Sequence, residues 1–193
     1  REHAWSVLAS GDFAAALPLF ERARSLSPDD PWLPFGMGLA LERLGRTEEA
    51  LSRHREAVEL DGAFALAWER LGLLHKEAGR ADEAAAAFRR ALQADPSFTH
   101  LTIELAEAYH ALGRLRDAWA QYERAARLFP RNEAVQAAVR AFLAEHREIV
   151  EGIERERAEG RRRLRHAQVA PAPPPGGIPV RVGSRAASPR FDW

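Results

Sequence analysis

The chain has 193 residues, of which 46% are hydrophobic and 29% charged, as is ordinary for a single folded domain. Its 28 basic residues balance 28 acidic ones, which argues against a molecule-wide field that would attract nucleic acid or an anionic membrane. The lack of cysteine excludes disulfides, thiolate metal sites and cysteine nucleophiles, and no apolar run is long enough to span a membrane.

The sequence repeats itself every 34 residues from its N-terminus. Each glycine of the repeat follows a segment with helical apolar spacing and can end that helix in the left-handed conformation, and a second helix follows and stops near a proline or glycine. Small residues stand where two helix axes approach closely, and large ones fill the gap. The columns of the repeat are Gly11, Gly45, Gly79, Gly113; Ala16, Ala50, Ala84, Ala118; Phe20, His54, Phe88, Tyr122; Ala23, Ala57, Ala91, Ala125; and Pro28, Gly62, Pro96, Pro130. The spacing predicts stacked helix pairs that share one core.

The unit from Ala65 to Phe98 is the most complete, with Trp68, Gly72 and Phe88 in phase with the columns above. In this pattern the chain resembles the tetratricopeptide repeat family over residues 1 to about 132. The resemblance implies an all-α fold, a right-handed α-solenoid of four helix pairs with a C-terminal capping helix and an extended Pro-rich tail. The expected units are a truncated first one over 1–30, then 31–64, 65–98 and 99–132. His54 and His75 depart from the family's aromatic preference, and we expect both to pack in the core.

The repeat pattern ends after Pro130. A single apolar stripe from Val135 to Ile153 predicts the capping helix, which with a charged extension covers 133–167. Residues 168–193 are rich in proline and glycine and predict an extended tail or linker, in which Ile178–Val182 alternates like a short strand. Because the chain starts at Arg1 and not at Met, its N-terminus appears truncated, so bacterial cytoplasm and periplasm both remain open.

In tetratricopeptide proteins the first helix of each pair lines a concave groove that binds peptides. Carried over to this chain, the resemblance implies apolar anchors for a peptide, with charged residues that set its register. The candidate peptide-binding residues are Trp5, Trp32, Phe35, Leu39, Arg43, Leu66, Glu69, Leu73, Lys76, His100, Ile103, Glu107 and His110. We expect the apolar ones to face solvent as one patch, the alternative being that some of them turn into the core. The family's clamp of asparagine and lysine on a ligand carboxylate is missing, since the only asparagine is Asn132.

Catalytic chemistry is not expected, because no nucleotide-binding, zinc-protease or serine-hydrolase motif occurs. His100, Glu104, Glu107 and His110 lie on one helix but do not offer three converging ligands, so we expect neither a metal nor a cofactor. The basic run Arg161–Arg165 lacks interleaved aromatic residues and is interpreted as a solvated helix, with nucleic-acid binding as the alternative.

The sequence thus predicts a non-catalytic protein–protein interaction scaffold that binds a peptide in its concave groove, within a larger assembly. The ligand could be the protein's own C-terminal tail or that of a neighbouring copy. The alternative is a regulatory or targeting domain of a longer multidomain enzyme, with the tail leading into the next domain.

Overall fold

The computed structural model describes residues 1–168, with side chains through Arg165. Within those residues it contains ten helices and no strand, which confirms the predicted all-α fold. The helices are α1 (Glu2–Ala9), α2 (Phe13–Leu26), α3 (Trp32–Arg43), α4 (Thr47–Leu60), α5 (Ala65–Glu77), α6 (Ala81–Ala94), α7 (Leu101–Ala111), α8 (Leu115–Leu128), α9 (Glu133–Glu145) and α10 (Arg147–Gln168). Apart from Gln168, which ends α10, the expected extended tail lies outside the described residues.

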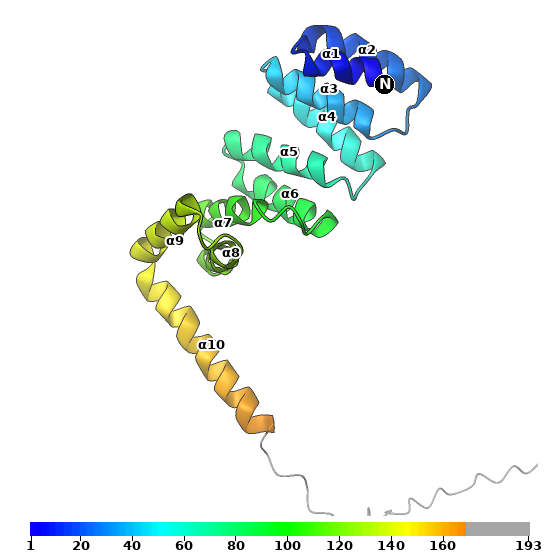
Figure 1. Ribbon diagram of the computed structural model, residues 1–193. Coiled ribbons are helices and arrows are strands. Elements are labelled where there is room, and N and C mark those ends of the chain that lie inside the picture. Colours follow the sequence, from blue (N-terminus) through cyan, green and yellow to red (C-terminus); the bar gives the residue numbers. More distant parts are fainter. Residues whose placement is uncertain (169–193) are drawn as a thin grey trace, which may run out of the picture. The chain divides into compact units, whose positions relative to one another are not determined.

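The first eight helices form four pairs, α1–α2, α3–α4, α5–α6 and α7–α8, and each helix packs against the next in the chain (Figure 1). The turn inside each pair contains a glycine of the repeat in the left-handed conformation. The φ angles are 88° at Gly11, 71° at Gly45, 70° at Gly79 and 68° at Gly113. The glycine column therefore ends the first helix of each pair, as the sequence predicts.

Small residues on the first helices allow large side chains of the second helices to enter the core. A Cβ built on Gly72 would lie 2.4 Å from Cε1 of Phe88, and one on Gly38 would lie 2.4 Å from Cε1 of His54. Phe20, Phe88 and His54 are fully buried. The close approach expected between the helices of a pair is present, and it depends on the missing Cβ atoms.

The segment after the fourth pair differs from the single capping helix predicted for 133–153. It forms two helices, α9 and α10, because His146 leaves the helical conformation with φ −121° and ψ 29°. Asn132 caps α9 by accepting hydrogen bonds from the backbone N–H groups of Ala134 and Val135. The apolar stripe itself is as predicted, since Val135, Phe142 and Ile153 are buried in one core with residues of α7 and α8.

Residues 1–154 form one compact unit. The remainder of α10, from Arg155, belongs to a second unit, in which the side chains of Arg161–Arg165 are exposed. Among the helices of the described residues, none has the length and apolar character needed to cross a membrane.

Candidate functional site

Five aromatic rings from four elements meet at the N-terminal end of the solenoid. Trp32 and Phe35 of α3 both contact the ring of Phe64, which precedes α5, with ring centroids 4.7 and 5.0 Å apart. Trp5 of α1 packs edge-on against Phe20 of α2 at 5.2 Å and lies 6.3 Å from Trp32. The cluster joins the first two helix pairs to the start of the third, and its edge-to-face contacts are of the kind that stabilise aromatic pairs.

The members of this cluster differ in their access to solvent. Trp32 keeps 42% of its surface exposed, and with the partly buried Trp5 it lines a surface depression together with Arg1 and Glu2. Phe35 is only 5% exposed. Phe35 therefore follows the alternative that some of the apolar candidates turn into the core, and Phe64 contacts it from the turn before α5.

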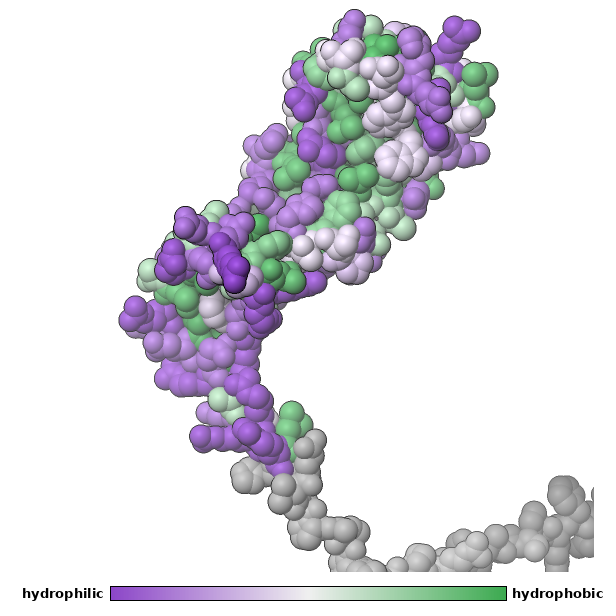
Figure 2. All heavy atoms as spheres, in the orientation of Figure 1, coloured by the Kyte–Doolittle hydropathy of each residue, from purple (hydrophilic) through white to green (hydrophobic). Residues whose placement is uncertain are grey.

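The other predicted apolar anchors lie at intermediate depth. Leu39, Leu66, Leu73 and Ile103 are each partly buried against the core while part of each side chain remains accessible. Figure 2 shows apolar and weakly polar side chains gathered over α1 to α5 on the face in view, bordered by hydrophilic ones. Leu39 also lines a second depression with Arg43, whose guanidinium lies 5.9 Å from the ring centroid of Phe13.

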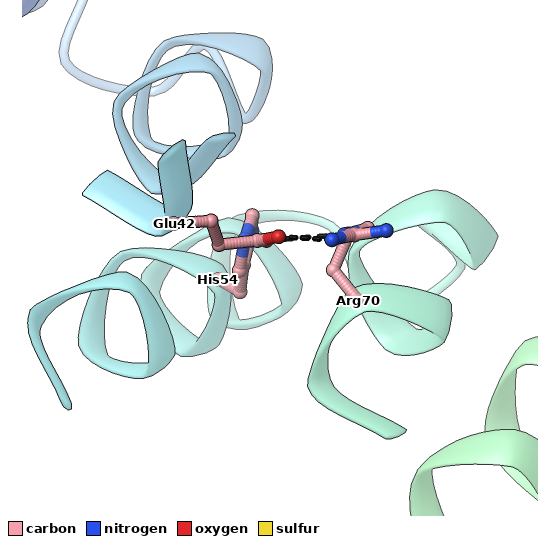
Figure 3. Close-up of polar contacts among 3 residues, drawn as sticks. All are labelled: Glu42, His54 and Arg70. Atoms are coloured by element: carbon pink, nitrogen blue, oxygen red, sulfur yellow. Dashed lines mark hydrogen bonds and ion pairs between the residues drawn. The ribbon is translucent and has the colours of Figure 1, made fainter. Parts of the chain in front are cut away.

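A carboxylate with a largely buried side chain links α3, α4 and α5 (Figure 3). Glu42 of α3 accepts a hydrogen bond from Nε2 of His54 of α4 at 2.6 Å and from Nε of Arg70 of α5 at 3.0 Å, and Arg70 Nη2 also contacts it. Its side chain is 9% exposed. Burial acts to raise the pKa of Glu42, but the hydrogen bonds from His54 and Arg70 outweigh burial and hold this pKa below its usual value.

Charged residues predicted to contact a ligand are instead paired across neighbouring first helices. Lys76 of α5 donates to Glu104 at 2.7 Å and to Glu107 at 2.5 Å, both on α7. Burial acts to lower the pKa of Lys76, and the hydrogen bonds to the two carboxylates overcome it and raise this pKa. Glu69 pairs in the same way with His100, 2.7 Å apart. These charges bind α5 to α7, so less of their hydrogen-bonding capacity is left for a peptide.

The predicted core histidines are buried. His54 has no exposed surface and His75 has 7%. Nδ1 of His75 accepts a hydrogen bond from Nε of Arg80 at 3.0 Å, which requires an unprotonated nitrogen. Burial, followed by the charges of Arg80 and Arg55, lowers the pKa of His75.

The predicted groove residue His110 takes no part in the contacts between α5 and α7. Its Nε2 lies 2.9 Å from Nε2 of His146, the residue between α9 and α10. His110 thus contacts His146, whereas His100, Glu104 and Glu107 pair with α5.

The profile of the tetratricopeptide repeat family matches residues 7–68 and 76–142. The chain belongs to the tetratricopeptide repeat family. The match covers parts of all four helix pairs and most of α9, and it includes the four glycine turns, so the 34-residue columns are those of tetratricopeptide units.

Relatives with known structures share the tetratricopeptide fold at low identity. MamA from Desulfovibrio magneticus RS-1, from residue 41 to its end, superposes with a TM-score of 0.68 at 19% identity, over 88% of this chain and 95% of that one. The first tetratricopeptide domain of Spaghetti (RPAP3), bound to the HSP90 peptide SRMEEVD, superposes with a TM-score of 0.55 at 18% identity, over 60% of this chain and 92% of that one.

Among curated proteins, the tetratricopeptide segment is 43% identical over 65 residues to the TPR repeat-containing thioredoxin TTL4 of Arabidopsis thaliana. The matched segment is 34% of this chain and 10% of that protein.

Sequence reasoning missed Arg70 and His146 as parts of polar clusters. A signal for Arg70 exists in the tetratricopeptide spacing, because polar contacts between successive units recur at fixed separations in the sequence. The separation is 28 residues for Glu42–Arg70 and Lys76–Glu104, and 31 residues for Glu69–His100 and Lys76–Glu107. Opposite charges at these offsets could be found in the sequence. No such repeat offset applies to His146, because it lies beyond the last tetratricopeptide unit.

Proposed function

We propose that this chain is a non-catalytic scaffold that binds a peptide segment along the first helices of its tetratricopeptide units, within a larger protein assembly. The tetratricopeptide fold is a protein-interaction fold, and the RPAP3 domain similar to this chain holds a peptide. The observation that carries the proposal is the pair Trp5 and Trp32, an aromatic surface that lines a depression and stays partly accessible beside a filled core.

The ligand would be held mainly by apolar contacts. Aromatic anchors dominate many peptide interfaces, and truncation of one often costs about 2 kcal/mol or more of binding free energy. Leu39, Leu66, Leu73 and Ile103 extend the accessible apolar surface from the aromatic end toward the fourth unit. Glu42, Glu69 and Lys76 are already paired with the scaffold, which favours an apolar ligand over a strongly charged one.

A random-peptide display library selected on the immobilised full chain tests this proposal. We expect the enriched peptides to carry aromatic or branched apolar residues. Trp32→Ala should weaken their binding about 30-fold, as the loss of about 2 kcal/mol implies. Leu128→Ala is the matched control, because Leu128 is also 42% exposed but lies at the end of α8. Equal affinity of the wild type and Trp32→Ala would refute the role of the aromatic surface.

One observation favours the alternative, a regulatory or targeting domain of a longer multidomain enzyme. The curated relative that matches is a thioredoxin with tetratricopeptide repeats, of which the matched segment is a tenth. The open reading frame that encodes this chain tests the alternative directly. A catalytic domain encoded in frame beside these residues would support it, and stop codons at both ends of the scaffold would oppose it.

A further inference from the structure

Two histidines and a glutamate converge where the last tetratricopeptide pair meets the capping helices. His110 lies near the end of α7, Glu145 is the last residue of α9, and His146 separates α9 from α10. The Nε2 atoms of the two histidines are 2.9 Å apart. The Glu145 carboxylate approaches with Oε2 3.8 Å from His110 Nε2 and Oε1 3.5 Å from His146 Nε2. One atom of each side chain lies within 4.8 Å of the other two.

The backbone fixes the position of His146 from both sides. Its N–H donates to the carbonyl of Phe142 at 2.9 Å, and its own carbonyl accepts from the N–H of Val150 at 3.0 Å. The non-helical φ and ψ at His146 allow its side chain and that of its neighbour Glu145 to approach the same histidine of α7. The junction is therefore a defined structural feature, anchored at its two helix ends.

Packing also fixes the orientation of both imidazoles. The ring of Phe142, which is 2% exposed, contacts His110 at 5.1 Å and His146 at 4.8 Å between centroids. The two imidazoles stand nearly perpendicular, at 88°. Ligands held in this way are preorganised, because ring rotation is restricted before any ion binds.

The three groups have the spacing of ligands around one ion. Two imidazole lone pairs that face each other at 2.9 Å repel unless a proton or a metal ion lies between them. A proton shared by the nitrogens leaves the carboxylate oxygens at 3.5 and 3.8 Å, beyond ordinary hydrogen-bond distance. Ligand atoms around a tetrahedral zinc ion lie about 3.3 Å apart, from metal–ligand bonds of roughly 2.0–2.1 Å. The N–N separation is shorter than this value, and the two N–O separations, each to a different oxygen of Glu145, are longer.

We propose that His110, Glu145 and His146 form a binding site for a divalent transition-metal ion, with Zn²⁺ as the best match. Two imidazoles and one carboxylate suit zinc, whereas magnesium and calcium prefer oxygen ligands alone. The Glu145 side chain is 62% exposed, so an ion can enter from solvent and keep water in its remaining coordination position. The site departs from the sequence-based expectation of no metal, because two of its ligands lie outside the repeats.

The bound ion would join α7 to the junction of α9 and α10. It would therefore fasten the capping helices to the last tetratricopeptide pair, and its ligands are other residues than Trp5 and Trp32, which carry the peptide proposal. Loss of metal binding would leave the peptide proposal untouched, and the reverse also holds.

Isothermal titration of the untagged full chain with Zn²⁺ tests the site. We expect one equivalent to bind, and at least tenfold weaker binding in His110→Gln, Glu145→Gln and His146→Gln. Glu145→Gln changes an exposed side chain and should keep the fold, which circular dichroism checks. His100→Gln is the matched control, since His100 is an exposed histidine at the start of the same helix α7.

A second readout separates coordination from a change in folding. Co²⁺ in place of zinc should give the strong visible absorption of low-symmetry, four-coordinate cobalt with the wild type and with His100→Gln, but not with the other three variants. Zinc should also slow hydrogen exchange of the α9 backbone in the wild type and in the control His100→Gln, but not in the three ligand variants. The proposal is overturned if the wild type binds no zinc, or if the three ligand variants bind it as tightly as the wild type.

Discussion

The ring of Phe88 occupies the space where a side chain of Gly72 would be, since a Cβ on Gly72 would lie 2.4 Å from Cε1 and 2.5 Å from Cδ1. Both residues are buried. This contact sets how closely α5 and α6 approach, and it yields a prediction about stability.

Gly72→Ala should destabilise the protein by about 1–3 kcal/mol through overpacking, although alanine is the better helix former. Urea denaturation measures the free energy of unfolding. Gly152→Ala is the matched control, because no atom lies within 4 Å of a Cβ at that position of α10. The control should stabilise by up to about 1 kcal/mol. Similar free energies for the two variants would contradict the packing argument.

Glu42→Gln should destabilise the protein by about 1–3 kcal/mol, because it removes the charge that compensates Arg70 and accepts from the buried His54. The figure is below that for a fully buried ion pair, since the Arg70 side chain is 32% exposed. Glu49→Gln is the control. It breaks the pair with Arg46, in which both side chains are exposed, and should change the free energy of unfolding little.

The same carboxylate predicts a sensitivity to acid. The pKa of Glu42 lies below its ordinary value of 4.5 in the folded protein, so the folded state binds this proton less readily than the unfolded state. The stabilisation is therefore present above about pH 4.5 and is lost as pH falls through the folded-state pKa. Denaturation at a series of pH values should show a steeper loss below 4.5 in the wild type than in Glu42→Gln. Parallel curves for the two proteins would exclude Glu42 as a source of the acid sensitivity.

The lowered pKa of His75 predicts a second pH dependence of stability, at a higher pH than that of Glu42. Its pKa is lowered from 6.5 by burial and by Arg80 and Arg55, so the unfolded state takes up a proton first as pH falls. Stability should therefore decrease as pH falls through about 6.5, with a slope of at most about 1.4 kcal/mol per pH unit for one proton. His75→Gln should flatten this part of the curve. His3→Gln, at an exposed position of α1, controls for the removal of a histidine.

Truncation of Phe35 should destabilise the protein more than truncation of Trp32. Phe35→Ala removes a ring that is 5% exposed and should cost about 3–5 kcal/mol of unfolding free energy. Trp32→Ala removes a side chain that is 42% exposed and should cost at least about 1 kcal/mol less. Thermal denaturation of both variants makes the comparison, and equal losses would show that Trp32 belongs to the core.

The tetratricopeptide fold could be predicted because its determinants are local and periodic. Gly79 ends α5 through its own φ angle, and Gly72 and Phe88 recur in phase with their equivalents. The break at His146 could not be predicted, because the apolar stripe continues on both sides of it and nothing in the local sequence forbids one helix.

The candidate site was predictable in part. Trp32, Phe35 and Leu39 lie on one face of α3 by spacing alone, so the sequence identifies that face but not the depth of each residue. Depth is decided by Phe64, which reaches Phe35 from the turn before α5 and so from outside α3. The pairing of Lys76 with Glu104 and Glu107 is a contact between units, which the pattern within one helix does not reveal either.

The links from Glu42 to Arg70 and from Lys76 to Glu104 connect α3 to α5 and α5 to α7. A receptor surface held in this way loses little conformational entropy when it is occupied. The cost of ordering then falls on the incoming chain, so a peptide already constrained as a helix or a turn would gain affinity without making any new contact.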